Sequence, residues 1–495
     1  MHPNFFLSAS ISINTFRMKF LSALAFFLCS FFSSLYGQDV VLKGSAEQFA
    51  GEELYIRKVM NPITGESRVI DTLSVDMKGD FETRISMTTD QWVFFNSGIF
   101  HLSLFLQPGK GYEIILPPKT RKSEADIRNP FFKPLIASMR VQKEYTLTDN
   151  FTCDPGDDIN SKLFRFDTLI LAGNREMMEA RRKLSPINSD SIIKSIERNF
   201  KGDTSSIFQS YRNYRYGIVK INSRDAGLEH IFDNYLKAGD PETNNPAYME
   251  LFNVMYEEFL FFYSRTTEGR SINYLVNRVH DLTALEDTLM KHPAVPDRKL
   301  AELIIIKEIF DIYFKDYFYR EALLILLDSV AANPVIPEYA MYARGVKKYL
   351  TRLRTGERPP AFSLLDQKKQ LRSLDDYRGK YVYLNFATPD NYSCLKEFPF
   401  LDVLYKTHKD YLEILTVMVT EDFSEMTDFM KKNQYDWPAL FYGNNDELLR
   451  DYDVRAYPTS YLLDPEGKII QSPATLATEG FEQQLFRIMR SRGDL

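Results

Sequence analysis

The chain has 495 residues, a formal net charge of −6 at pH 7, and 44% hydrophobic and 26% charged residues. A single hydrophobic core rarely grows beyond roughly 250–300 residues, so this length predicts a multidomain protein. The negative balance offers no basic surface for nucleic acid, and we expect no nucleic-acid partner.

The N-terminal segment has the pattern of an export signal. Lys19 precedes the apolar run FLSALAFFLCSFFSSLYG, which ends in small residues before Gln38. This pattern is typical of a secretory signal peptide, so we expect residues 1–37 to direct export to the periplasm or cell envelope, with Met18 as an alternative start. The alternative is an uncleaved segment, which would be the only attachment of the protein to a membrane.

Two different patterns follow the signal. Residues 39–118 contain six short alternating or apolar runs, such as EELYIRKV and DFETRISM, separated by Gly, Asp and Asn turn signals. They predict an all-β sandwich. In residues 121–350 the strand signals fade and apolar residues recur at helical spacing, which predicts a helical domain. The polar stretch TRLRTGERPPAF, broken by glycine and proline, predicts a linker at residues 351–358.

The last domain, residues 359–491, alternates strand and helix signals. The apolar run YVYLNFA is followed by the helical pattern CLKEFPFLDVLYKTH, and LEILTVMVT by DFSEMTDFMKKN. SYLLDPEGKII then predicts a hairpin, and FEQQLFRIMRS a closing helix. Alternation of this kind predicts βαβ units and a parallel sheet.

These landmarks resemble the thioredoxin superfamily, specifically the TlpA/ResA type of envelope thiol-disulfide oxidoreductase. The matching stretches are GERPPAFSLLDQKKQLRSLDDYRGKYVYLNF, the helix with Glu397 and Pro399, and VRAYPTSYLLDPEGKI. The resemblance implies an α/β thioredoxin fold in which Pro458, after Tyr457, is a cis proline beside the active site. It also implies thiol-disulfide exchange with a polypeptide or thiol-containing protein partner, and no cofactor.

The sequence departs from the family at its central motif. Relatives carry two cysteines separated by two residues at the start of a helix, and ungapped alignment places Asn391 at the first and Cys394 at the second. An amide cannot attack a disulfide, so we expect dithiol catalysis to be weak or lost. Asp390 or Asn391 is well suited to cap the helix instead. Cys394 is then either a lone reactive thiol or a small buried residue.

Two functions remain open from the sequence. One is a thiol-disulfide oxidoreductase with weakened catalysis, and the other is a non-catalytic protein that binds polypeptides through the thioredoxin groove or uses its helical domain as a scaffold. Tyr392, Ser393 and Glu397 are expected to shape the site together with Asn391 and the Tyr457–Pro458 pair. The six histidines are scattered without metal-ligand spacing, so no metal site is predicted.

Overall fold

The computed structural model describes residues 37–120, 122–129, 132, 134–148, 157–183, 188–224, 226–237, 239–420, 422–443 and 445–494. The predicted signal peptide lies outside these residues, except for Gly37. The chain divides into two compact units. The first contains the residues up to Thr120 and Leu135–Met255, and the second contains Arg121–Pro134 and Tyr256–Leu495.

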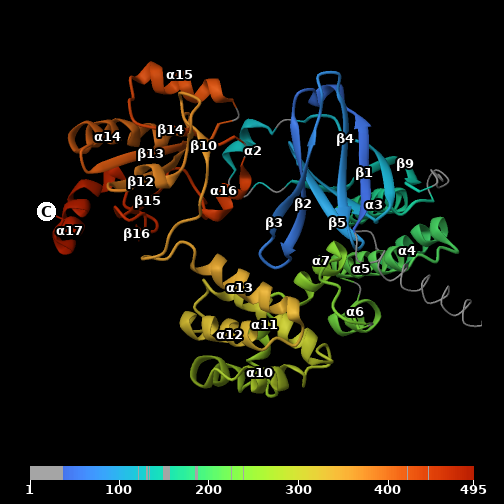
Figure 1. The fold of residues 1–495 in the computed structure, drawn as a ribbon. Helices are drawn as coiled ribbons and strands as arrows, with labels where there is room; N and C mark the ends of the chain where they lie inside the picture. The colour runs from blue at the N-terminus through green and yellow to red at the C-terminus, as the bar shows by residue number, and fades with distance from the viewer. Residues whose placement is uncertain are drawn as a thin grey trace, which may run out of the picture. The chain divides into compact units, whose positions relative to one another are not determined.

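Two β-sheets form the core of the first unit (Figure 1). Buried residues of both sheets belong to one hydrophobic cluster, among them Val40 and Leu42 of one sheet and Val93 and Leu104 of the other. The four-stranded sheet has the order β4 (Asp80–Met87), β1 (Gln38–Ser45), β7 (Lys110–Ile115), β9 (Arg140–Thr146). The five-stranded sheet has the order β3 (Glu66–Ser74), β2 (Glu53–Asn61), β5 (Gln91–Ser97), β6 (Phe100–Leu106), β8 (Leu135–Ser138).

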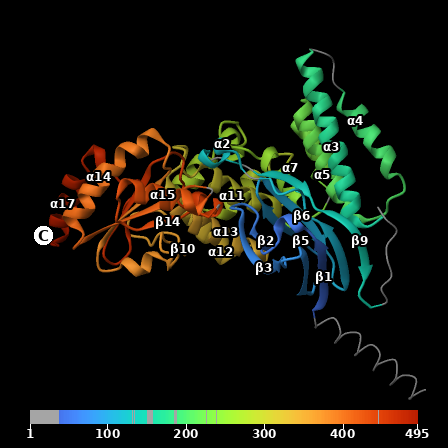
Figure 2. The same ribbon diagram turned by 90° about the horizontal axis from the view of Figure 1, so that it is seen from above.

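Strands β8 and β9 lie within residues 121–350, where the sequence predicts helices. Each completes a sheet edge, because β8 pairs in parallel with β6 and β9 pairs antiparallel with β7. Helices follow these strands, and α3, α4 and α5 pack side by side (Figure 2). The helical elements of this unit are η1 (Glu47–Phe49), α3 (Ile159–Arg182), α4 (Ser189–Glu197), η2 (Arg198–Phe200), α5 (Ser206–Ser223), α6 (Leu228–Tyr235) and α7 (Pro246–Met255).

The helical part of the second unit packs around α11, which has an almost entirely buried middle from Leu300 to Ile309. These buried residues include Glu302, Lys307 and Glu308 besides the apolar side chains, and a helix that is buried all round needs neighbours on all sides. The elements of this part are α8 (Phe259–Tyr263), α9 (Ile272–Tyr274), the π-helix η3 (Leu275–Val279), α10 (Leu282–Leu289), α11 (Arg298–Ile312), α12 (Arg320–Ala332) and α13 (Pro337–Thr351). The short helix α2 (Glu124–Arg128) instead packs through Ile127 against the core of the C-terminal part.

A five-stranded mixed sheet organises the C-terminal part, in the order β14 (Ala439–Phe441), β13 (Leu412–Met418), β12 (Tyr381–Ala387), β15 (Thr459–Leu463), β16 (Ile469–Gln471). Strand β12 is parallel to β13 and antiparallel to β15. Every residue of β12 and β13 is buried, as expected for central strands covered on both faces. The predicted alternation of strands and helices in this part is confirmed, and β12 and β13 form the predicted parallel pair.

The remaining elements of this part flank the sheet or precede it. Helix α14 (Tyr392–His408) packs beside α17 (Phe481–Arg492), since His408 contacts both Glu482 and Phe486. The others are β10 (Leu364–Leu365), β11 (Leu371–Arg372), η4 (Leu374–Tyr377), α15 (Phe423–Asn433), α16 (Asp446–Asp451) and η5 (Ala477–Glu479). Among the described residues, no helix is both long enough and apolar enough to cross a bilayer.

The predicted linker is hydrogen-bonded to the C-terminal sheet. The amide of Gly356 donates to the carbonyl of Ile469 at 2.8 Å, and the amide of Ile469 donates to the carbonyl of Glu357 at 2.9 Å. Arg352 donates to the carbonyls of Asp451 and Arg450. This stretch therefore extends the edge at β16 and is part of the second unit.

Candidate functional site

The loop after β12 and the Tyr457–Pro458 peptide lie at the same end of the central sheet. The antiparallel register places Phe386, near the end of β12, opposite Thr459, the first residue of β15. The residues that follow Phe386 therefore run beside those that precede Thr459. The Tyr457–Pro458 peptide bond is cis. The fold thus brings together two segments that are about seventy residues apart in sequence.

Asn391 is the N-cap of helix α14. Its backbone is extended, with φ −79° and ψ 126°, and its side-chain Oδ1 accepts hydrogen bonds from the amides of Ser393 at 2.9 Å and Cys394 at 3.2 Å. These amides are among the orphan donors of the first helical turn. A thiolate at a helix N-terminus is stabilised by the same donors and by the helix dipole. A neutral amide oxygen satisfies them here.

Cys394 is fully buried and is a free thiol. Burial raises its pKa to about 11, contacts with Thr388 oppose the shift, and the charges of Asp390 and Glu397 add to it. The thiol is therefore almost entirely protonated at neutral pH. Since the thiolate is the nucleophile in disulfide exchange, this cysteine has the properties of a small apolar core residue.

Tyr457 forms a buried wall of the same corner. Its hydroxyl has no hydrogen-bond partner among the described residues, and burial raises its pKa above the usual range. The carboxylate of Asp446 adds to this shift and itself accepts a hydrogen bond from the hydroxyl of Tyr442. Asp446 also forms an ion pair with Lys122 at 2.6 Å. The sequence analysis did not identify Asp446, Tyr442 or Lys122, because no motif connects these residues to the cysteine position.

Glu397 holds a different contact. Its buried carboxylate accepts hydrogen bonds from the amides of Ala477 at 2.8 Å and Thr478 at 3.2 Å, and from the Thr478 hydroxyl. Hydrogen bonds to a charged group are stronger than neutral ones, so this carboxylate ties α14 to η5. It positions the helix that carries Asn391 and Cys394.

Tyr392 and Ser393 are exposed at the start of α14, where 71% of Tyr392 is accessible. The ammonium of Lys396 lies 4.4 Å from the centre of the Tyr392 ring. Further along the helix Leu395, Phe400 and Val403 are also exposed. These four apolar side chains share the outward side of α14, which we call the exposed face of α14. The apolar spacing from Tyr392 to Val403 was the available signal for it.

The described residues contain no group of three or more histidine, cysteine or carboxylate side chains that could hold a metal ion. The site is therefore composed of an amide cap, a buried thiol, a buried tyrosine and an exposed apolar helix face. Nothing in this set supplies an ionised nucleophile at neutral pH. The arrangement can present a surface to an extended chain beside the Tyr457–Pro458 peptide.

Comparison with known proteins adds independent information on this part of the chain. Residues 355–472 match the model of the AhpC/TSA family. The chain is 32% identical over 136 residues to the thiol-disulfide oxidoreductase ResA of Bacillus subtilis, covering 27% of this chain and 75% of the relative. It is 33% identical over 137 residues to the thiol-disulfide oxidoreductase ResA of Geobacillus kaustophilus, covering 27% of this chain and 78% of the relative.

A similar solved structure is the thioredoxin domain of a thiol-disulfide oxidoreductase from Bacteroides vulgatus. It shares 27% identity, covers 28% of this chain and 99% of that domain, and has a TM-score of 0.26. The sequence matches to relatives above 30% identity, which extend over most of their length, confirm the resemblance predicted from the landmark stretches.

Proposed function

Because the chain belongs to the ResA-like thiol-disulfide oxidoreductases of the thioredoxin superfamily, we propose that its C-terminal domain retains a polypeptide-binding surface but has lost dithiol catalysis. The proposal includes export by residues 1–37 and a place in the periplasm or cell envelope, which the signal pattern supports. The partner is a polypeptide or a thiol-containing protein.

The proposal rests on one observation: the Oδ1 atom of Asn391 accepts hydrogen bonds from the backbone amides of Ser393 and Cys394. In dithiol exchange the first thiolate attacks a disulfide sulfur, an S–S bond breaks, and the second thiol then releases the mixed disulfide. Asn391 has no sulfur with which to begin this cycle. Cys394 cannot replace it, since it is buried and its pKa is about 11.

Retention of binding is supported by the surface around the corner. Tyr392 lies at the N-terminus of α14, the exposed face of α14 extends from it along the helix, and Pro458 marks the neighbouring loop. Extended peptides bind to such loops by strand-like pairing of backbone groups, while exposed aromatic side chains supply contact area. This binding mode requires no ionised thiol.

An insulin-reduction assay tests the loss of catalysis. We expect the wild-type protein to remain at the background rate with dithiothreitol alone, and Asn391→Cys to reduce insulin measurably because it restores the attacking thiol at a helix N-terminus. Asn391→Ser is the matched control, since serine also caps helices but carries no thiol. Insulin reduction by the wild-type protein above the background rate and as fast as by Asn391→Cys would contradict the proposal.

A capture experiment tests the binding function. An unfolded, reduced and alkylated polypeptide such as carboxymethylated lactalbumin should bind the wild type and Cys394→Ser equally. Tyr392→Ser should weaken binding by about 5-fold or more, because aromatic anchors contribute most of the energy of such contacts. Equal capture by all three proteins would remove this corner from the binding site. Capture that survives deletion of residues 357–495 would assign binding to the rest of the chain.

A further inference from the structure

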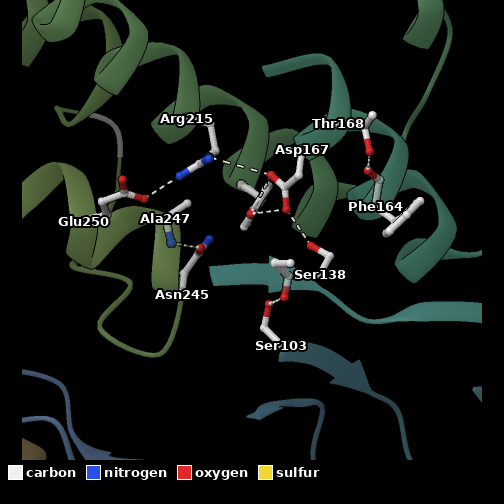
Figure 3. Close-up of polar contacts among 11 residues, drawn as sticks. Ser103, Ser138, Phe164, Asp167, Thr168, Arg215, Asn245, Ala247 and Glu250 are labelled. Atoms are coloured by element: carbon white, nitrogen blue, oxygen red, sulfur yellow. Dashed lines mark hydrogen bonds and ion pairs between the residues drawn. The ribbon is translucent and has the colours of Figure 1, made fainter. Parts of the chain in front are cut away.

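The first unit contains a cavity of about 910 Å³ that lies far in sequence from the cysteine site. Its floor is formed by residues of β2, β5 and β6, and its other walls by α5, α7 and the loop that precedes α7. Asn245 and Glu250 belong to this second wall and are seen with their polar contacts in Figure 3. The volume is within the range of ligand-binding pockets, roughly 300–1,000 Å³.

The cavity follows an incompletely paired seam in the five-stranded sheet. β2 is paired with β3 from Glu53 to Asn61, and β5 with β6 from Gln91 to Ser97. Between β2 and β5, however, the register contains one bridged pair, Arg57 opposite Phe94.

Beyond that bridge, Lys58 and Val59 of β2 and Gln91, Trp92 and Val93 of β5 all line the cavity. Successive residues of a strand point to opposite faces, so a lining made of consecutive residues means that backbone also borders the cavity. Backbone N–H and C=O groups that border a cavity can serve as hydrogen-bond donors and acceptors for a bound chain.

Aromatic side chains give the cavity a rigid wall. Trp92 is half-buried, stacks on Tyr211 at 5.5 Å and meets the edge of Phe105 at 5.3 Å. The Tyr211 hydroxyl donates to the carboxylate of Asp167, at 2.9 Å and 3.0 Å from its two oxygens. Asp167 also accepts a hydrogen bond from the hydroxyl of Ser138, as Figure 3 shows. This network fixes the tyrosine and therefore the indole that lies against it.

The charged side chains of the lining are predominantly acidic: Asp90, Glu242 and Glu250, against the single cation Lys58. Glu242 is fixed in place, because it accepts from the Tyr214 hydroxyl and from the Asn245 side chain, both at 2.9 Å.

Two further groups complete the electrostatics. Glu250 pairs with Arg215, which also lies 3.7 Å from Asp167, so its charge is partly compensated (Figure 3). Burial lowers the pKa of His101 to about 4, so this lining residue adds no positive charge at neutral pH. The balance favours a cationic ligand and disfavours anionic ones.

We propose that this cavity binds an extended polypeptide segment that carries a basic side chain. The backbone of the segment hydrogen-bonds to the backbone groups of β2 and β5 that border the cavity, an apolar side chain packs on Trp92, and the basic side chain lies between Asp90 and Glu242. The site belongs to a different unit from Cys394 and does not depend on the function proposed for that domain.

Tryptophan fluorescence of the full chain provides the test. The chain has two tryptophans, and Trp437 in the second unit is fully buried. Trp92 is therefore the residue whose emission and acrylamide quenching should respond to a ligand in the cavity. The probe is a decapeptide of alternating lysine and valine, and the comparison ligands are the glutamate–valine decapeptide and maltohexaose. Trp92→Phe should abolish any signal that arises from the cavity.

We expect saturable protection of Trp92 by the lysine peptide and binding at least 10-fold weaker by the glutamate peptide. Asp90→Asn should weaken lysine-peptide binding about 2- to 5-fold, and Lys58→Gln should strengthen it by a similar factor, since each changes one partly exposed charge. Glu179→Gln, an exposed substitution on α3 outside the cavity, is the matched control and should leave the affinity unchanged. Equal binding of both peptides, a response to maltohexaose alone, or no response that depends on Trp92 would overturn the proposal.

Discussion

At the scale of single residues, Asn391 decides the chemistry of the C-terminal domain. Asparagine and aspartate are both good N-caps, so the sequence left Asp390 and Asn391 as candidates. In the structure Asn391 is the N-cap, because its side chain accepts hydrogen bonds from the amides of Ser393 and Cys394. The partners of Glu397 could not be predicted, because Ala477 and Thr478 lie about eighty residues away and no spacing rule connects them.

The cap itself can be tested by exchange. Asn391→Ala should destabilise the first turn of α14 by about 1 kcal/mol, which corresponds to an approximately 5-fold faster hydrogen exchange of the Ser393 and Cys394 amides. Asn391→Asp keeps an acceptor at the same position and should preserve their protection. Mass spectrometry or NMR can measure both. Unchanged exchange in Asn391→Ala would show that the side chain contributes nothing to the helix start.

Glu397 gives a second prediction at this scale. Glu397→Ala removes the acceptor of two backbone amides, and hydrogen bonds to a charged group contribute about 1.5–3 kcal/mol. We expect the C-terminal domain to unfold at lower urea and the Ala477 and Thr478 amides to lose protection. Glu479→Ala is the control, because Glu479 is an exposed glutamate of the same short helix η5, and it should have little effect on either measurement. Wild-type protection in Glu397→Ala would contradict the role of this carboxylate.

At the scale of elements, the periodic segments of the C-terminal part and the six strand signals within residues 39–118 were predictable, whereas the strands β8 and β9 were not. β12 and β13 are apolar throughout and fully buried, which gives a strong signal. β8 has four residues, three of them at least partly exposed, and it is a strand because β6 lies beside it. Pairing of this kind depends on tertiary context, which a single sequence does not display.

Glu302 in α11 makes the stability of the helical part depend on pH. It is buried, and burial raises its pKa to about 7, while the amide of Val335 opposes the shift and the charge of Glu286 adds to it. The folded state therefore holds a proton that the unfolded chain releases near pH 4.5. The contribution of protonated Glu302 to the free energy of unfolding is therefore complete below pH 4.5, and it is lost as the pH rises through about 7.

Glu302→Gln should remove this dependence. Glutamine stays neutral and keeps a carbonyl that can accept from Val335, so α11 should be more stable than in the wild type at pH 8, by on the order of 2 kcal/mol. The two proteins should converge near pH 4.5. Hydrogen exchange of the α11 amides at several pH values measures the difference, with the exposed Glu338→Gln as control. A parallel pH dependence in both proteins would contradict the assignment.

At the scale of the whole molecule, the chain separates between α7 and α8, inside the region predicted as one helical domain. The helices from α3 to α7 belong with the sheets, and those from α8 to α13 belong with the C-terminal part. Helical periodicity identifies helices but carries no information about the neighbour against which they pack. The sequence alone therefore could not predict that the helical region divides between α7 and α8.

The linker contacts lead to a prediction at this scale. A fragment that begins at Thr351 keeps the bonds from Gly356 and Glu357 to Ile469, whereas one that begins at Pro359 loses them. Each bond contributes about 0.5–1.5 kcal/mol, so the longer fragment should melt several degrees higher. Calorimetry of residues 351–495 and 359–495 compares them. Identical melting temperatures would mean that the stretch is only a connection.

The reactivity of Cys394 in the native protein tests the central claim most directly. Alkylation with iodoacetamide, followed at the peptide that contains Cys394 by mass spectrometry, should be roughly 100-fold or more slower in the folded protein at pH 7 than in urea, because its pKa is about 11 and it is buried. The rate should keep rising with pH through pH 9 without a plateau. Rapid labelling at pH 7 with an inflection near or below neutrality would reveal an accessible thiolate and would contradict the account.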